Sequence, residues 1–140
     1  MTIQQGLTNS FKEQMVQAQQ NLTGDTLKMA LYTGFATLGP TTTAYSTTNE
    51  ASGTGYTEGG NVLSNVSVAS SANGIMYVSF ANPVWSNASF TVRGALIYNS
   101  TQSNSSVAVL DFGADKTCAN QTFTVTLPSN TATTALIRFP

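Results

Sequence analysis

Residues 89–98 of the chain read Ser-Phe-Thr-Val-Arg-Gly-Ala-Leu-Ile-Tyr. Side chains of this stretch alternate between two faces, which is typical of a β-strand. One face carries Phe90, Val92, Leu96 and Tyr98, and the other carries Arg93, Ala95 and Ile97. Gly94 stands where a β-bulge is expected, because glycine inside a strand often marks one. The stretch therefore predicts a strand in the core of a β domain.

The same two-residue period recurs on both sides of this stretch. It predicts six further strands, at 26–32, 62–69, 75–81, 107–112, 122–127 and 134–139. Asn73-Gly74 separates two of them and is a strong hairpin signal, because both residues tolerate a positive φ. In 26–32 the alternation indicates one buried face, whereas the apolar run 107–112 favours a central strand. The positions expected to point inward include Phe90, Leu96, Leu110, Phe123, Val125 and Ile137.

Seven strands with turn signals at these intervals predict a mainly β fold, an antiparallel β-sandwich with one short N-terminal helix. We expect a single domain over 1–140, because 140 residues are enough for one core. Its parts are a helix at 8–20, an extended loop at 34–61 and the main sandwich strands at 62–140.

The helix at 8–20 is predicted from a capping box and an apolar stripe. Ser10 and Glu13 have the spacing at which a hydroxyl and a carboxylate satisfy free N–H groups at a helix start. Leu7, Phe11, Met15 and Ala18 recur at helical spacing. The stripe is narrow, so the helix must pack on something. That surface is either the core of the same domain or a neighbouring subunit.

The segment 34–61 is rich in glycine and threonine and has Tyr45 and Tyr56 as its bulky residues. A loop of this length is uncommon in a compact domain and indicates a binding loop, a packed Ω-loop or a disordered segment. We expect it to be mobile in isolation. In an assembly, extended arms of this composition can lie along a neighbour, and the alternative is a simple surface excursion. The side chains expected at a partner interface are therefore Phe11, Met15, Leu22, Tyr45 and Tyr56.

Charged residues make up only 8% of the chain, against about 25% in an average soluble domain. Thr, Ser and Asn occur 22, 15 and 12 times, so hydroxyls and amides provide the solubility. The net charge is −1 and the basic residues stand singly, so we expect binding to neither nucleic acid nor membrane. The first six residues lack the cationic and apolar parts of a targeting signal, which predicts a protein made in the cytosol.

Histidine is absent and Cys118 is the only cysteine. These two facts exclude histidine-based nucleophile systems and cysteine-cluster zinc sites within the chain. We expect no cofactor and no metal, and we interpret Cys118 as a small structural thiol. Six Asn-x-Ser/Thr sequons occur, and we interpret them as a product of composition: Asn21, Asn65, Asn87, Asn99, Asn104 and Asn120.

The acidic residues give only weak catalytic signals. The tripeptide 111–113 spells the metal-binding motif of kinases, but the other kinase motifs are missing, so we interpret it as a strand ending in a turn. Asp111 and Asp115 are the best available acid pair for a hydrolase, although both suit turns equally well. Glu50 and Glu58 lie in the glycine-rich loop, where nothing in the sequence fixes their separation.

Several blocks of the chain, in order, resemble a family of small virion structural proteins of tailed bacteriophages, including phages of cyanobacteria. The blocks are Ser-Phe-Lys at 10–12, Asp-Thr-Leu-Lys-Met-Ala-Leu-Tyr-Thr at 25–33, Thr-Thr-Ala-Tyr at 42–45, Gly-Thr-Gly-Tyr at 53–56, Gly-Gly at 59–60, Arg-Gly-Ala-Leu-Ile-Tyr-Asn at 93–99 and Ala-Val-Leu-Asp-Phe-Gly at 108–113. Members of this family are described as head, tail or simply structural proteins. The resemblance brings no catalytic residues with it.

Composition and resemblance together predict a non-enzymatic virion protein assembled in the host cytoplasm. The first expectation is a capsid decoration (cement) protein that binds the outer face of the major capsid protein lattice and self-associates. A tail or head–tail component is the alternative within the same class. Outside that class, a carbohydrate-binding adhesion module would use Trp85, Tyr45 and Tyr56, and a small hydrolase would use the two aspartates.

Overall fold

Two antiparallel sheets and one short helix make up the computed structural model, which describes residues 2–70, 74–128, 130–131 and 133–139. The first sheet has five strands in the order β1-β7-β6-β2-β3, and the second has three in the order β4-β5-β8. The elements are β1 (Gly6–Leu7), α1 (Asn9–Val16), β2 (Leu27–Tyr32), β3 (Asn61–Val62), β4 (Ser67–Ser70), β5 (Met76–Ser79), β6 (Val84–Asn99), β7 (Ser105–Thr124) and β8 (Ile137–Phe139). The prediction of a mainly β, sandwich-like fold is confirmed.

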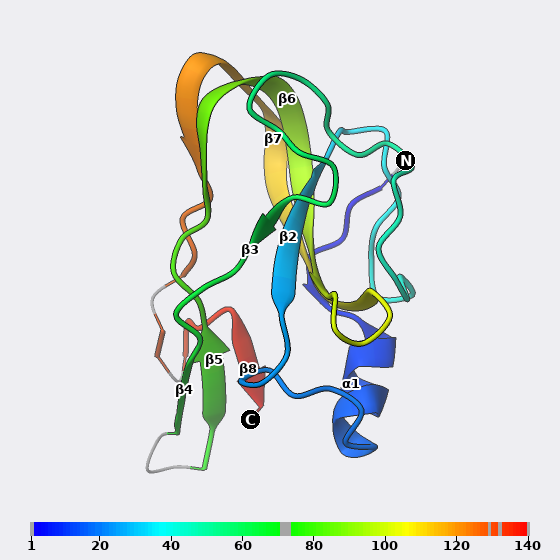
Figure 1. Cartoon of the computed structure of the whole chain (residues 1–140). Coiled ribbons are helices and arrows are strands. Elements are labelled where there is room, and N and C mark those ends of the chain that lie inside the picture. The colour runs from blue at the N-terminus through cyan, green and yellow to red at the C-terminus, as the bar shows by residue number, and fades with distance from the viewer. Residues whose placement is uncertain (1, 71–73, 129, 132, 140) are drawn as a thin grey trace.

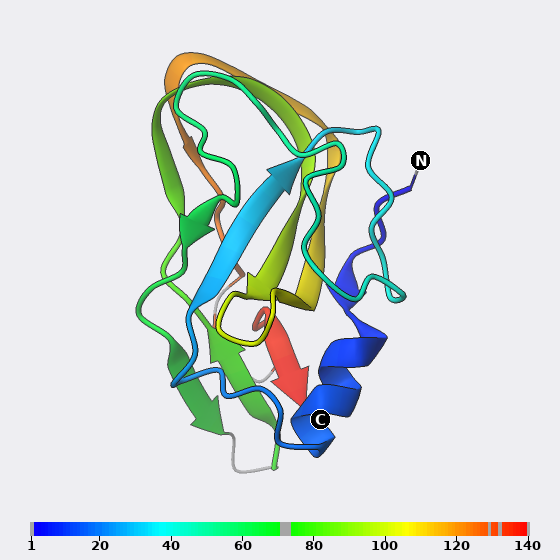
Figure 2. The same ribbon diagram turned by 45° about the vertical axis from the view of Figure 1, so that its right-hand side comes forward.

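The long strands β6 and β7 are the main structural elements of the molecule. They pair along most of their lengths and arch over one end, while α1 and the small sheet lie at the other (Figures 1 and 2). Predicting separate strands at 107–112 and 122–127 was wrong, because β7 runs unbroken from Ser105 to Thr124. Its polar middle stays extended since it pairs with β6 through several register shifts. The tripeptide 111–113 thus lies within a strand and does not end one.

The predicted alternation along β6 fails at one point. Val92 and Ala95 both belong to the main core, whereas Leu96 packs in a second core on the opposite face of the sheet. The pairing register with β7 shifts between Val92 and Gly94, whose partners are Lys116 and Asp111. This bulge reverses the side-chain parity, because one irregular residue is enough to exchange the faces. Phe90 and Leu96 therefore do not share a face, although both are buried as expected.

The second core explains why β2 is buried on both faces, and the prediction of one buried face was wrong. One face of β2 joins the main core, which connects the two sheets and α1. The other face joins a smaller core, whose members come from the N-terminal segment, the loop and the large sheet: Ile3, Ala30, Tyr32, Ala36, Leu38, Leu96, Tyr98 and Val109. The first part of the loop 34–61 thus covers the outer face of the large sheet.

The helix is shorter than predicted and begins differently. It spans Asn9–Val16, and its N-cap is Thr8, whose hydroxyl accepts from the N–H of Phe11 at 3.3 Å. Ser10, the predicted cap, lies inside the first turn with its hydroxyl 3.1 Å from that of Ser106. The helix ends before Ala18 because that residue adopts a φ of 59°.

The smaller strands are also shorter than the sequence patterns indicated. Segment 62–69 is divided between β3 in the large sheet and β4 in the small one, so the chain changes sheets inside it. β4 and β5 pair antiparallel, which confirms a hairpin. The turn of this hairpin was predicted at Asn73-Gly74. Asn73 lies outside the described residues, and Gly74 has a φ of +81°. Segment 134–139 forms a strand only at 137–139.

The sequon asparagines have structural roles. Four of them adopt a left-handed backbone, namely Asn65, Asn87, Asn104 and Asn120, a conformation that Asn tolerates better than most residues. Asn99 is fully buried, and its amide donates to Asp25 at 2.7 Å. The Asn21 side chain accepts from two backbone N–H groups of the following turn.

Candidate functional site

The middle of the loop that follows β2 is hydrogen-bonded to the large sheet. The Ala51 N–H donates to Leu31 at 2.8 Å, and the Thr33 N–H donates to Asn49 at 3.0 Å. Glu50 forms an antiparallel bridge with Tyr32. These contacts pair the loop with the last residues of β2. They divide the loop into a first half on the outer face and a second half near the main core. We expected a mobile segment, and the structure places a hydrogen-bonded one there.

Glu50 joins the two halves through its carboxylate. Its Oε1 accepts from the Tyr45 hydroxyl at 2.6 Å, and its Oε2 accepts from the Tyr56 hydroxyl and from the Gly59 N–H, the latter at 2.8 Å. Tyr45 stacks on Tyr98 in the second core, with ring centroids 4.6 Å apart. Tyr56 packs instead against the main core. One half-buried carboxylate thus connects both sides of the sheet.

The tyrosines around Glu50 are harder to ionise than free tyrosine. Burial raises the pKa of Tyr98 to about 12, and the negative charge of Glu50 adds to the shift. Burial also raises the pKa of Tyr45 and Tyr56, and the hydrogen bond that each phenol donates to Glu50 raises it further. For Tyr32, burial is again the main cause of a raised pKa. The fold therefore favours four protonated phenols beside one carboxylate.

Gly60 closes the loop against β2. A Cβ at this position would lie 1.8 Å from the Met29 carbonyl oxygen, and the residue has a φ of +79°. No other residue type fits without moving a strand, because both the backbone conformation and the space exclude a side chain. The Tyr98 hydroxyl donates to the Gly59 carbonyl at 2.7 Å and holds the same corner.

The predicted interface side chains pack within the chain. Phe11 is 0% exposed, and its ring lies 6.3 Å from that of Phe139. Leu22 is also buried, while Met15, Tyr45 and Tyr56 are half-buried. The structure uses Phe11 and the two tyrosines to hold the helix and the loop in place. Of the alternatives for the helix, packing on the core of the same domain is the one observed.

Met15 and Leu22 nevertheless border an exposed apolar groove of about 390 Å³ between α1 and the small sheet. Its far wall contains Val68 and Met76, which are 43% and 45% exposed. Both come from a part of the sequence without charge, since no Asp, Glu, Lys or Arg stands between Glu58 and Arg93. An apolar groove without charged residues on its strand wall is suited to contact with another protein surface.

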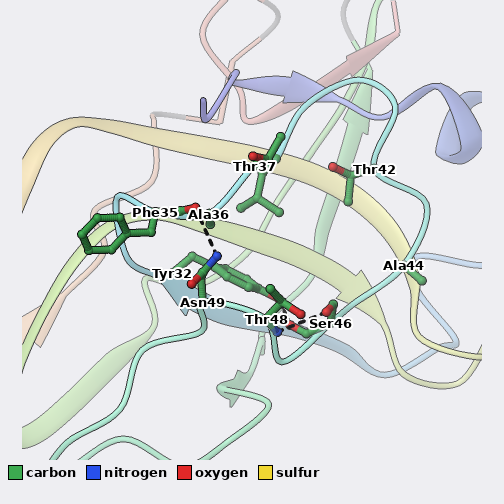
Figure 3. Close-up of a pocket in the computed structure, with 10 residues that line it drawn as sticks. Tyr32, Phe35, Ala36, Thr37, Thr42, Ala44, Ser46, Thr48 and Asn49 are labelled. Atoms are coloured by element: carbon green, nitrogen blue, oxygen red, sulfur yellow. Dashed lines mark hydrogen bonds between the residues drawn. The ribbon is translucent and has the colours of Figure 1, made fainter. Parts of the chain in front are cut away.

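A second exposed apolar feature lies at the turn after β2. Phe35 is 70% exposed, although its backbone is held firmly. Its carbonyl accepts from the Asn49 amide at 3.1 Å (Figure 3), and its N–H donates to the Thr33 hydroxyl at 3.4 Å. Sequence reasoning missed Phe35, because only the exposed surface of the folded chain distinguishes it from the buried phenylalanines.

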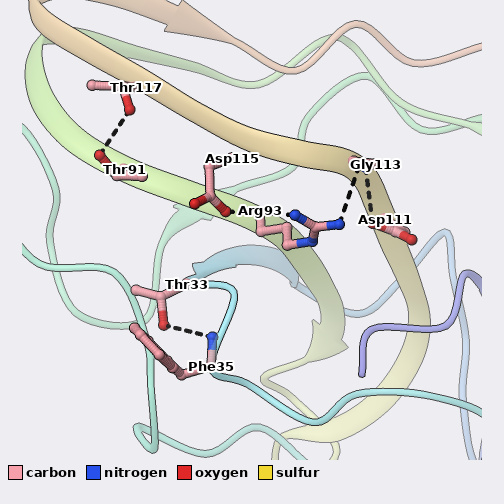
Figure 4. Close-up of polar contacts among 8 residues, drawn as sticks. All are labelled: Thr33, Phe35, Thr91, Arg93, Asp111, Gly113, Asp115 and Thr117. Carbon is pink, nitrogen blue, oxygen red and sulfur yellow. Dashed lines mark hydrogen bonds and ion pairs between the residues drawn. The ribbon is translucent and has the colours of Figure 1, made fainter. Parts of the chain in front are cut away.

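Beside Phe35 lies the one ion pair among the described residues. The Arg93 guanidinium is 3.8 Å from Asp115 Oδ1, and it also donates to the Gly113 carbonyl at 3.2 Å (Figure 4). Thr33, Phe35, Thr91, Arg93 and Asp115 line a common recess of about 430 Å³. Asp115 therefore faces Arg93 across the β6–β7 ribbon, and the interpretation of this residue as a turn former was wrong.

The other chemistry-bearing residues have structural partners. Asp111 accepts from the Gly113 N–H at 2.9 Å, which fixes the irregular point of β7. Cys118 is buried with its thiol directed at the Phe90 carbonyl, as expected of a structural cysteine. In the described parts of the chain, no group of three or more metal-ligating side chains comes together.

The aromatic residues proposed for an adhesion module are not exposed platforms. Trp85 is 2% exposed and packs against Phe123, with ring centroids 6.1 Å apart. Tyr45 and Tyr56 direct their hydroxyls at Glu50. The three rings pack against the protein's own cores, so none of them is presented to solvent as a flat surface for a saccharide.

The structure defines the chain as a mainly β domain with two antiparallel sheets in a sandwich-like arrangement. Its single described helix is too short to cross a membrane. Comparisons of the chain with family models, curated proteins and solved structures give no match.

Proposed function

We propose that the chain is a non-enzymatic structural protein of a tailed-bacteriophage virion that decorates the outer face of the major capsid protein lattice. The observation that carries this proposal is where the phage-like blocks fall in the fold. Block 25–33 contains β2, 59–60 closes the loop against it, 93–99 is the buried half of β6, and 108–113 runs from the buried part of β7 to its exposed middle. The resemblance therefore involves the framework of the domain.

The groove beside α1 is the surface that best suits the contact with the capsid protein. Its exposed members Val68 and Met76 are apolar and belong to the uncharged stretch that precedes Arg93. Contact through such a surface gains free energy by burying apolar area, at roughly 25 cal/mol per Å². It needs no ion pairs, which agrees with the low charge of the whole chain. Self-association of the chain is also part of the proposal.

Copy number tests the location in the virion. Quantitative mass spectrometry of purified particles should find hundreds of copies of the chain, in a fixed ratio to the major capsid protein. A count of a few dozen or fewer would overturn decoration and support the tail or head–tail alternative. Absence from the particle would overturn the virion role altogether.

Surface variants test the groove. Purified protein is added to particles made by a phage that lacks the gene, and bound protein is measured after sedimentation. Val68→Asp and Met76→Asp should abolish binding, because each places a charge on the apolar wall. Val62→Asp is the matched control, since Val62 is an exposed valine on the edge strand of the other sheet. Equal binding by all three variants would exclude the groove.

A further inference from the structure

The ring of Phe35 is presented to solvent on a fixed backbone. The turn that carries it is closed by the Ala36 N–H, which donates to Thr33 at 3.1 Å, and is tied to the second half of the loop through Asn49. Among the described residues it is the only aromatic side chain that is largely exposed. A ring held in water on an ordered turn offers a ligand a flat apolar surface at little conformational cost.

The opposite wall of the recess supplies polar groups with unused bonding capacity. The Arg93 guanidinium has five N–H donors, and within the chain it contacts the Gly113 carbonyl and, at 3.8 Å, Asp115. Asp115 is 63% exposed, so its carboxylate can accept hydrogen bonds from a ligand. The hydroxyl of Thr91, which meets that of Thr117 at 2.9 Å, lies along the same ribbon (Figure 4).

Gly34 brings the two walls together. A Cβ on this residue would lie 3.2 Å from Arg93 Cδ and 3.3 Å from Asp115 Oδ1. The backbone that precedes Phe35 therefore packs directly on the ion pair. Because of this contact, the apolar ring and the charged pair border one recess of about 430 Å³ and keep a fixed relation to each other.

The chemistry of these walls selects the ligand. We infer that the recess binds one pyranose ring of a neutral saccharide, with the C–H face of the sugar against Phe35 and neighbouring hydroxyls bonded to Arg93 and Asp115. An aromatic surface next to a donor and an acceptor matches a molecule that is apolar on one face and rich in hydroxyls at its edge. An anion is disfavoured, since Asp115 compensates the charge of Arg93.

Ligand-observed saturation-transfer NMR tests the inference on the whole chain, with the methyl glycosides of glucose, galactose, mannose and N-acetylglucosamine as probes. At least one glycoside should receive saturation at its ring C–H protons. Phe35→Ala should weaken that binding about tenfold, the effect of losing one aromatic contact, and Asp115→Asn should weaken it as well. Phe35→Tyr should retain binding, because it keeps the ring.

Val16→Ala is the matched control, since Val16 is a highly exposed apolar residue in α1, which lies at the other end of the molecule (Figures 1 and 2). It should bind the glycoside like the unaltered chain. The melting temperature of each variant shows whether it is folded. If Phe35→Ala does not fold, Asp115→Asn decides the matter, because it should still weaken glycoside binding while Phe35→Tyr retains it.

Three results would overturn the inference: no saturation transfer to any of the four glycosides, equal binding by the unaltered chain and Phe35→Ala, or loss of binding in Val16→Ala. Loss of particle binding in Phe35→Ala, without glycoside binding by the unaltered chain, would identify the ring as a contact to the capsid protein instead. The inference does not depend on the decoration role, because particle binding and glycoside binding are measured separately.

Discussion

Removing single hydroxyls around Glu50 should destabilise the fold to different extents. The Tyr56 hydroxyl donates to Glu50 and also accepts from the Leu31 N–H at 3.0 Å, whereas the Tyr45 hydroxyl makes the Glu50 contact alone. A hydrogen bond to a charged group contributes about 1.5–3 kcal/mol, and a buried donor without a partner costs about 1–3 kcal/mol. Leu31 is fully buried, so Tyr56→Phe incurs both losses. We expect about 3 kcal/mol for Tyr56→Phe.

For Tyr45→Phe we expect about 1 kcal/mol, because the ring is half-exposed and water can replace the lost donor. Urea unfolding followed by the fluorescence of Trp85, the single tryptophan, measures both values. Tyr77→Phe on β5 is the control and should change stability by less than about 0.5 kcal/mol. Equal losses for Tyr45→Phe and Tyr56→Phe, or a larger loss for Tyr45→Phe, would refute the proposed geometry around Glu50.

Three further outcomes follow from the same structure. Stability should be flat between about pH 5 and 9, because the chain has no histidine. It should fall above about pH 10, where unfolded tyrosine ionises while Tyr98, with its pKa raised to about 12, stays protonated in the fold. Burial opposes ionisation of Asp25, but hydrogen bonds from Asn21, Asn99 and Gln102 outweigh it and lower the pKa of this carboxyl. The contribution of ionised Asp25 to the free energy of unfolding is therefore lost below about pH 4. Melting curves across the pH range check both the alkaline and the acid limit. Leu96→Ala, at a fully buried position, should cost about 2–5 kcal/mol in urea unfolding, whereas Val62→Ala on an exposed edge should cost less than about 0.5 kcal/mol. Raising salt to about 1 M should leave particle binding unchanged in sedimentation, since screening acts on exposed charges, and release by salt would contradict an apolar interface.

Period-two patterns predicted which residues are buried better than they predicted where the strands begin and end. Leu110, Val125 and Ile137 are buried as expected, because an apolar residue on an alternating segment has few other places to go. Parity across Gly94 was predicted wrongly, since the bulge depends on how many residues of β7 oppose β6. The number of opposing residues is set when β6 and β7 pair, so the sequence of either strand alone does not predict it.

The loop shows a different limit of sequence analysis. Its composition indicates turns and extended chain, but nothing in it indicates that Glu50 meets two tyrosines or that Gly60 packs on a strand. These contacts arise because the uncovered face of β2 needs a cover, and the nearest chain able to supply one is the segment that follows it. For the same reason Tyr45 and Tyr56, which the sequence assigned to a partner interface, pack within the chain. The exposed ring of Phe35 depends on the same packing, which the sequence does not reveal.

The apolar groove beside α1 and the exposed ring of Phe35 lie at opposite ends of the domain, so each can bind its ligand without the other. β2 points away from the end that holds α1 and the β4–β5 hairpin, and the turn with Phe35 follows its tip (Figures 1 and 2). A copy that docks through the groove thus leaves the recess at Arg93 accessible. Distant sites without shared partners act additively. The double variant Val68→Asp with Phe35→Ala should therefore lose particle binding as Val68→Asp does and glycoside binding as Phe35→Ala does, whereas a glycoside defect in Val68→Asp alone would show that the two ends are coupled.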